Sequence, residues 1–119
     1  MAIRTVAQRT ALAAAYASAA PYGALFTADP GTSGTATGEV TGGSPAYARK
    51  AAGWGTAANS AVSSGSMVFD VPSGTTVTYF GLTVAGTAGG ADVRDSVALT
   101  SQAFASQGQY TVNAAYTQS

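Results

Sequence analysis

The stretch "TVTYFGLTVA", residues 76–85, decides the fold of this chain. Successive side chains of a β-strand point to opposite faces of its sheet. One face of this strand would carry Thr78, Phe80, Leu82 and Val84, and the other Val77 and Tyr79. Since both faces carry bulky side chains of the types that favour strands, the pattern predicts a strand in the middle of a sheet.

Shorter stretches with apolar or alternating patterns lie on both sides of this strand. Strands are predicted at residues 22–28, 46–52, 66–71, 96–101 and 109–117. The segments between them, residues 29–45, 53–65, 72–75 and 86–92, are rich in Gly, Ser, Thr or Pro and are predicted to be loops, with one short strand near Glu39 and Val40. Short strands separated by turns are typical of an antiparallel β-sandwich or a small barrel, here over residues 22–117.

One N-terminal α-helix is predicted over residues 5–19. Thr5 and Gln8 have the spacing of a capping box, the residues that follow are mostly Ala, and Pro21 ends the helix. Its apolar face is thin, so it needs the sheet for stability. Helix and strands together predict a mainly β single domain over residues 1–119.

The chain is poor in charge. Charged residues make up 8% of it, and five basic residues balance five acidic ones. No net field would attract nucleic acid, and no stretch is apolar and long enough to span a membrane. The Ala-rich N-terminus resembles a signal peptide, but Arg9 interrupts its apolar part, so we expect none. A low charge protects a free monomer poorly against aggregation. This favours a protein that works inside an assembly, most simply as a homo-oligomer.

The chain contains no Cys and no His. Disulfides are therefore excluded, as are the Ser-His and Cys-His nucleophile pairs and the commonest zinc ligands. We expect no enzymatic activity, no catalytic residue, no cofactor and no metal site.

The sequence "LFTADPGTSGTATGEV", residues 25–40, raises the question of a phosphate or calcium loop. A phosphate loop needs a Lys after its glycines and a helix that follows, and neither is present. A calcium loop needs several oxygen ligands at alternating positions, whereas only Asp29 and Glu39 are acidic. We favour a turn at Asp29, Pro30 and Gly31, in which Pro presets one backbone angle and Gly supplies another.

The segment "AYARKAAGWG", residues 46–55, has the densest cluster of residues suited to binding. Arg49, Lys50 and Trp54 could stack a sugar or clamp a partner if the Trp is exposed. The alternative, which we favour, has Arg49 pointing outward and Trp54 filling the core. Alternation places Arg49 and Lys50 on opposite faces, so at least one of them should pair with another group or reach an interface.

A second charged group lies at Asp92, Arg94 and Asp95, beside a predicted strand. Two carboxylates can share acid–base work in a cleft. We favour a surface turn with a local Arg–Asp pair. The tyrosines of the predicted strands, Tyr79, Tyr110 and Tyr116, are expected to be core and sheet residues.

Three motifs in this order resemble a family of small tailed-bacteriophage virion proteins. They are "ALFTADPGTSGTATGEVTGGSPAYARKAAGWG" (24–55), "SMVFDVPSGTTVTYFGLTVAG" (66–86) and "ALTSQAFASQGQYTVNAA" (98–115). Phe26 stands where the family often has His. The resemblance implies a β-rich structural module of the virion with no catalytic residue, and it marks as fold determinants Asp29, Pro30, Gly31, Gly43, Tyr47, Ala48, Arg49, Gly74 and Gly81. A salt bridge between Glu39 and Arg49 is a hypothesis that follows from it.

The preferred expectation is a capsid decoration or head-stabilising protein, bound as a homo-oligomer outside the major capsid lattice. The alternative is a tail fibre or minor tail module that binds a host surface glycan, with Tyr47 and Trp54 exposed. Both place the chain in the virion, with the major capsid protein or other virion proteins as partners. The residues expected to contact partners are Ile3, Arg4, Tyr47, Arg49, Lys50 and Trp54. Edge strands could also extend the sheet of a neighbouring molecule.

Overall fold

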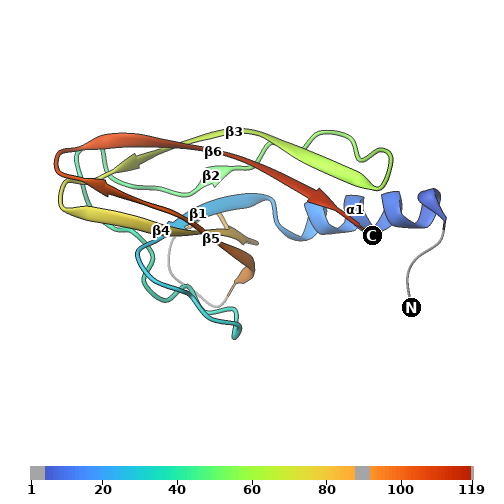
Figure 1. The fold of residues 1–119 in the computed structure, drawn as a ribbon, viewed down its shortest axis with the longest axis horizontal. Helices are drawn as coiled ribbons and strands as arrows, with labels where there is room; N and C mark the ends of the chain where they lie inside the picture. The colour runs from blue at the N-terminus through green and yellow to red at the C-terminus, as the bar shows by residue number, and fades with distance from the viewer. Residues whose placement is uncertain (1–4, 88–91, 119) are drawn as a thin grey trace.

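Two antiparallel sheets face each other, and one helix extends from the end of the pair, as Figure 1 shows. The computed structural model describes residues 5–87 and 92–118. Its elements are α1 (Val6–Ala19), β1 (Tyr22–Phe26), β2 (Lys50–Ala51), β3 (Ala61–Val71), β4 (Thr75–Thr83), β5 (Val93–Phe104) and β6 (Gly108–Thr117). The expectation of a mainly β, antiparallel sandwich with an N-terminal helix is confirmed.

The helix α1 begins and ends where the sequence predicts. The side chain of Thr5 caps it by accepting a hydrogen bond from the Gln8 N–H at 3.4 Å. Only Ala13 is buried within it, in keeping with the thin apolar face. The helix contacts β3 and β6, and Figure 1 shows it beside the ends of these strands.

The larger sheet has the strand order β2-β1-β4-β5. β4 therefore lies between two partners, which confirms the central position predicted from its sequence. Strict alternation does not hold along it, because Val77 joins Phe80 and Leu82 in one core cluster. The pairing of β4 with β5 shifts between Val77 and Tyr79, and again between Leu82 and Thr83. At both shifts the extra residues lie on β5, so β5 is a bulged strand.

The smaller sheet consists of β3 and β6, paired along their whole lengths. β3 begins at Ala61, so the prediction of a loop over residues 53–65 is wrong for its last five residues. β6 follows the predicted alternation: Tyr110, Val112, Ala114 and Tyr116 are partly buried, and the residues between them are exposed. The one register shift of the pair places its extra residue on β3, which leaves β6 regular.

The strand predicted at residues 46–52 shrinks to β2, two residues long. The chain around it joins the two sheets along one side. The Ala52 N–H donates to Pro21 O, the Gly65 N–H donates to Ala52 O and the Gly55 N–H donates to Ser63 O, each at 2.9 Å. This side of the sandwich is therefore closed by backbone hydrogen bonds between the chain near β1 and β3.

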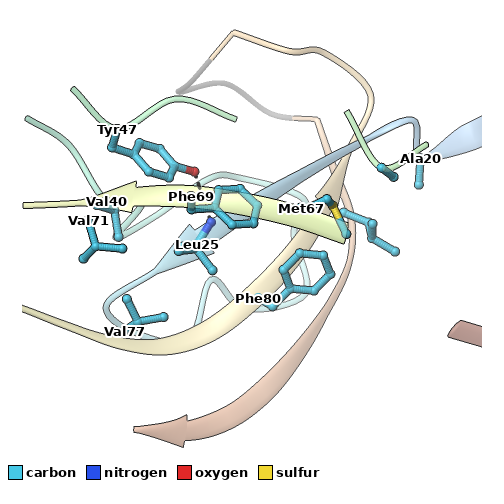
Figure 2. Packing of buried hydrophobic residues seen from close by; sticks show 11 residues of the cluster. Ala20, Leu25, Val40, Tyr47, Met67, Phe69, Val71, Val77 and Phe80 are labelled. Atoms are coloured by element: carbon cyan, nitrogen blue, oxygen red, sulfur yellow. Dashed lines mark hydrogen bonds between the residues drawn. The ribbon is translucent and has the colours of Figure 1, made fainter. Parts of the chain in front are cut away.

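The core lies between the sheets and is drawn in Figure 2. The side chains of Leu25, Met67, Phe69, Val71 and Val77 are at most 1% exposed. Phe69 packs edge-on against Phe80 and lies nearly parallel to Tyr47. Across the described ranges, no helix has the length and apolar character that a membrane crossing requires.

Candidate functional site

Arg49, expected to point outward or to contact a partner, is buried instead. Its side chain has no exposed surface. Its Nε and Nη2 donate to the two carboxylate oxygens of Glu39, each at 2.9 Å, and its Nη1 donates to Asp92 and to the carbonyl of Ala85, also at 2.9 Å. The Glu39–Arg49 salt bridge is confirmed in bidentate form, and the outward position of Arg49 is wrong. A buried guanidinium needs such partners because a lone buried charge is costly.

Tyr47 is also part of this buried network, at 8% exposed. Its hydroxyl donates to Glu39 Oε2 at 2.8 Å and accepts a hydrogen bond from the Leu25 N–H at 3.0 Å (Figure 2). Tyr47 thus links β1 to the chain near Glu39. Its ring and hydroxyl are both used inside the molecule, so Tyr47 is not exposed as glycan contact would require.

The ionic groups of the network hold one another in their charged forms. Hydrogen bonding to Glu39 raises the pKa of Arg49, burial opposes this, and Asp92 adds to the rise. Burial would raise the pKa of Asp92, but the hydrogen bonds from Arg49 and from the Ala85 N–H hold it below its usual value. Burial is also the main cause that raises the pKa of Tyr47, which keeps its hydroxyl protonated.

Trp54 and Lys50 lie in different surroundings from Arg49. The Trp54 ring packs against the core, and its Nε1–H donates to Ala20 O at 2.7 Å, which agrees with the reading of Trp54 as a core residue. It also packs edge-on against Tyr16 of the helix. Lys50 lies half-buried on the short strand β2. The predicted binding cluster is therefore not a continuous surface, because its Arg is buried in the ionic network and its Trp serves helix packing.

The turn expected at Asp29 is confirmed. Its Oδ1 accepts a hydrogen bond from the Gly31 N–H at 2.8 Å, and Gly31 has φ of 79°, which glycine adopts without strain. Pro30 lies between them, buried. This geometry is that of a turn closed by an Asp side chain.

The prediction of a local Arg–Asp pair around Arg94 is wrong. Asp92 instead pairs with the distant Arg49, and Asp95 accepts a hydrogen bond from the Tyr16 hydroxyl at 2.5 Å. Ile3 and Arg4, two residues expected to contact partners, lie outside the described residues.

A cavity of about 450 Å³ lies on the side of the sandwich opposite to the closed one, between β5 and β6. Phe80 and Leu82 of β4 reach it from the core, and Leu99 and Val112 line it from the two strands beside it. Tyr16 and Tyr116 stack at its end with ring centroids 3.9 Å apart. No motif of the sequence pointed to this surface. The sequence feature that could have indicated it is the regular, uncharged alternation of residues along β6.

The described chain, residues 5–87 and 92–118, contains no group of three acidic, His or Cys residues placed to hold a metal ion. The carboxylates of Glu39, Asp92 and Asp95 are all engaged in hydrogen bonds with side chains of the protein. The open cavity is mostly apolar, with Asp95 as its charged lining residue.

A family model described as "Podophage GP4 fiber I protein gp80" matches residues 5–118. The match spans the helix and every strand of the structure. No curated protein and no solved structure matches the chain.

Proposed function

The chain belongs to the podophage GP4 fiber I protein gp80 family, and we propose from this that it is a structural component of a phage tail fibre. Membership makes it a structural protein of the bacteriophage virion. A location on the tail is the more specific part of the proposal. It rests on the fibre description of a family whose model matches residues 5–118.

The tail location replaces the capsid surface as the preferred expectation. Low charge, small size and the absence of His and Cys suit a head-stabilising protein and a fibre module equally. The fibre description of the family supports the fibre module. In this proposal the partners are other virion proteins of the tail.

The proposed role is mechanical and not enzymatic. The charged side chains of the buried network, Glu39, Arg49 and Asp92, join segments that are distant in the sequence. The buried network supports this role because it fastens the long loop before β2 to the segment after β4. A module that transmits force or spaces other domains needs such fastening of its loops.

Glycan binding through Tyr47 and Trp54 is not part of this proposal. Tyr47 is 8% exposed, and Trp54 packs on Ala20 and Tyr16. The Tyr47 ring therefore lies inside the protein, and the Trp54 ring is partly buried against the core and the helix.

Labelled electron microscopy of intact virions tests the proposal. Antibodies against the purified chain, detected with gold, should mark the tail fibres. Antibodies against the major capsid protein serve as the control for head labelling. Gold distributed over the head surface would contradict the proposal and return the preference to capsid decoration.

A further inference from the structure

The side of the sandwich between β5 and β6 is open. On the opposite side, residues 52–55 join the two sheets by backbone hydrogen bonds. On the open side, β5 ends the larger sheet and β6 ends the smaller one, and no strand of the described chain pairs with the outer edge of either. Figure 1 shows these two strands in separate layers.

The two open edges differ in how well they are protected against pairing with another strand. β5 is bulged at two places and carries Arg94 and Asp95. Bulges and charged side chains are devices that keep an edge strand from pairing. β6 is ten residues long, has no bulge and contains no charged residue and no Pro. It lacks each of these protections and is rich in Tyr, Thr and Val, which favour strands.

The smaller sheet has only the two strands β3 and β6. Two strands alone are marginal, and a third adds independent stability. The inward side chains of β6, from Tyr110 to Tyr116, are half-buried, whereas the inward side chains Met67, Phe69 and Val71 of β3 are at most 1% exposed. The cavity beside Val112 reaches inward to Phe80 and Leu82, which are 4% and 5% exposed.

We propose that β6 pairs in antiparallel orientation with β6 of a second copy of this chain. The result is a continuous four-stranded sheet, β3-β6-β6-β3, across a two-fold axis. If the axis passes beside Asn113, Tyr110 lies opposite Tyr116 of the other copy and Val112 lies opposite Ala114. This register places inward residues opposite inward residues, as a shared core face requires.

Charge favours a second copy as the occupant. Like charges directly opposite each other destabilise a strand pair. Because β6 carries no charge, two identical strands can face each other without repulsion. A two-fold contact also uses the same edge on both copies, so it leaves no second unprotected edge of β6 exposed.

Ala115 is the residue at which this contact can be blocked. The Ala114 N–H donates to Ser64 Oγ and the Gln118 N–H donates to Ser60 O, each at 2.8 Å, so these amides face β3. Backbone groups alternate along a strand, and the Ala115 N–H therefore faces the open edge. Ala115→Pro removes this donor without removing a hydrogen bond to β3, and Ala115→Lys adds a charge to the same edge.

Ser63→Lys is the matched control. Ser63 is the partner of Ala115 on β3, it is exposed, and the edge of β3 beside it is covered by Gly55. Sedimentation equilibrium of the purified full chain over a concentration series should show a dimer. Either Ala115 variant should weaken that dimer by about tenfold or more, because each loses interactions twice across the axis. The control should dimerise as the unmodified chain does, and circular dichroism should show folded protein in all three.

Cross-linking tests the register. The chain has no Cys, so Asn113→Cys introduces a single thiol. Oxidation should give a disulfide-linked dimer from Asn113→Cys, and none from Ser63→Cys. A monomer at every concentration, an oligomer that both Ala115 variants leave intact, or a closed trimer would overturn the proposal. These measurements use the isolated chain, so their outcome is independent of whether the protein resides on the tail.

Discussion

A single guanidinium, that of Arg49, holds together three segments that the sequence separates widely. It binds Glu39, ten positions before it, and Ala85 and Asp92, up to 43 positions after it. Bidentate contact with Glu39 fixes its plane, which a Lys cannot reproduce. The long loops of this fold are therefore held by electrostatics at one point, in addition to the apolar core.

Arg49→Met should lower the free energy of unfolding by about 3–5 kcal/mol, because it leaves the buried Glu39 carboxylate and the partly buried Asp92 carboxylate without their counter-charge. Urea denaturation followed by circular dichroism measures this. Arg94→Met is the control, since Arg94 is exposed and lies on β5. Equal stability of the two variants would show that the buried network does not stabilise the fold.

The pH dependence of stability should reveal the contribution of the Asp92 charge. Its pKa in the folded state is below the ordinary value of 3.8. Its contribution is therefore fully present above that ordinary value and is lost as the pH falls through the folded-state pKa. Asp92→Asn should cost about 1–2 kcal/mol at neutral pH. The difference from the unmodified chain should shrink in denaturation curves measured at successively lower pH below 3.8. A difference that stays constant over this range would contradict the role of the Asp92 charge.

At this scale the sequence predicted one pair of the network and missed the rest. The Glu39–Arg49 pair followed from the resemblance to phage virion proteins. The partnership of Arg49 with Asp92 could not be read from the sequence, because it depends on how the segment after β4 returns toward β2. The alternation rule predicted the wrong orientation for Arg49, because Arg49 lies just before a strand of two residues and not within a long strand.

At the scale of elements, β4 is the centre of the larger sheet, and its Gly81 has a specific reason to be glycine. A Cβ built on Gly81 would lie 2.6 Å from Cε1 of Phe26, a fully buried ring on the neighbouring strand. The Phe26 ring can approach the backbone of β4 this closely only because residue 81 has no side chain.

Gly81→Ala should therefore lower the free energy of unfolding by about 1–3 kcal/mol through overpacking. Gly55→Ala is the control, because a Cβ there meets nothing closer than 3.6 Å and no positive φ is required. Thermal unfolding of both variants measures the effect. A Gly81→Ala protein as stable as the control would mean that Phe26 moves aside at no cost.

The helix α1 is predicted to depend on Tyr16 for its position. The Tyr16 ring stacks on Tyr116 and packs edge-on against Trp54, and its hydroxyl donates to Asp95. Tyr16→Ala should speed hydrogen exchange of the α1 amides, since an Ala-rich helix is marginal alone. Ser18→Ala, at an exposed position of the helix, should leave exchange unchanged. Equal exchange rates in the two variants would contradict the role of Tyr16.

Elements with strong alternation could be predicted from the sequence, and elements fixed by tertiary pairing could not. β6 was predicted because its apolar residues repeat every second position, and β4 because bulky side chains of strand-favouring types lie on both of its faces. The first half of β3 contains Ser63, Ser64, Gly65 and Ser66, which lack that signal. These residues are extended because β6 pairs with them on one side and residues 52–55 cover the other.

At the scale of the whole molecule, the protein is elongated, with extents of 48 × 26 × 24 Å, and one side of its sandwich is open. Charge is sparse over the entire chain, at 8% of residues. The sequence predicted the fold class, and its resemblance to phage proteins predicted a structural protein of the virion. The open side could not be predicted, because it depends on which strands end up unpaired.

We propose that this protein is a structural part of the tail fibre, and its copy number in the virion distinguishes a fibre protein from a protein of the head. Purified virions should be analysed by quantitative mass spectrometry, with this chain measured against the major capsid protein and a tail protein. A fibre protein should be present in few copies per virion, in constant proportion to the tail protein. Hundreds of copies, in a simple ratio to the major capsid protein, would contradict it and identify a protein of the head lattice.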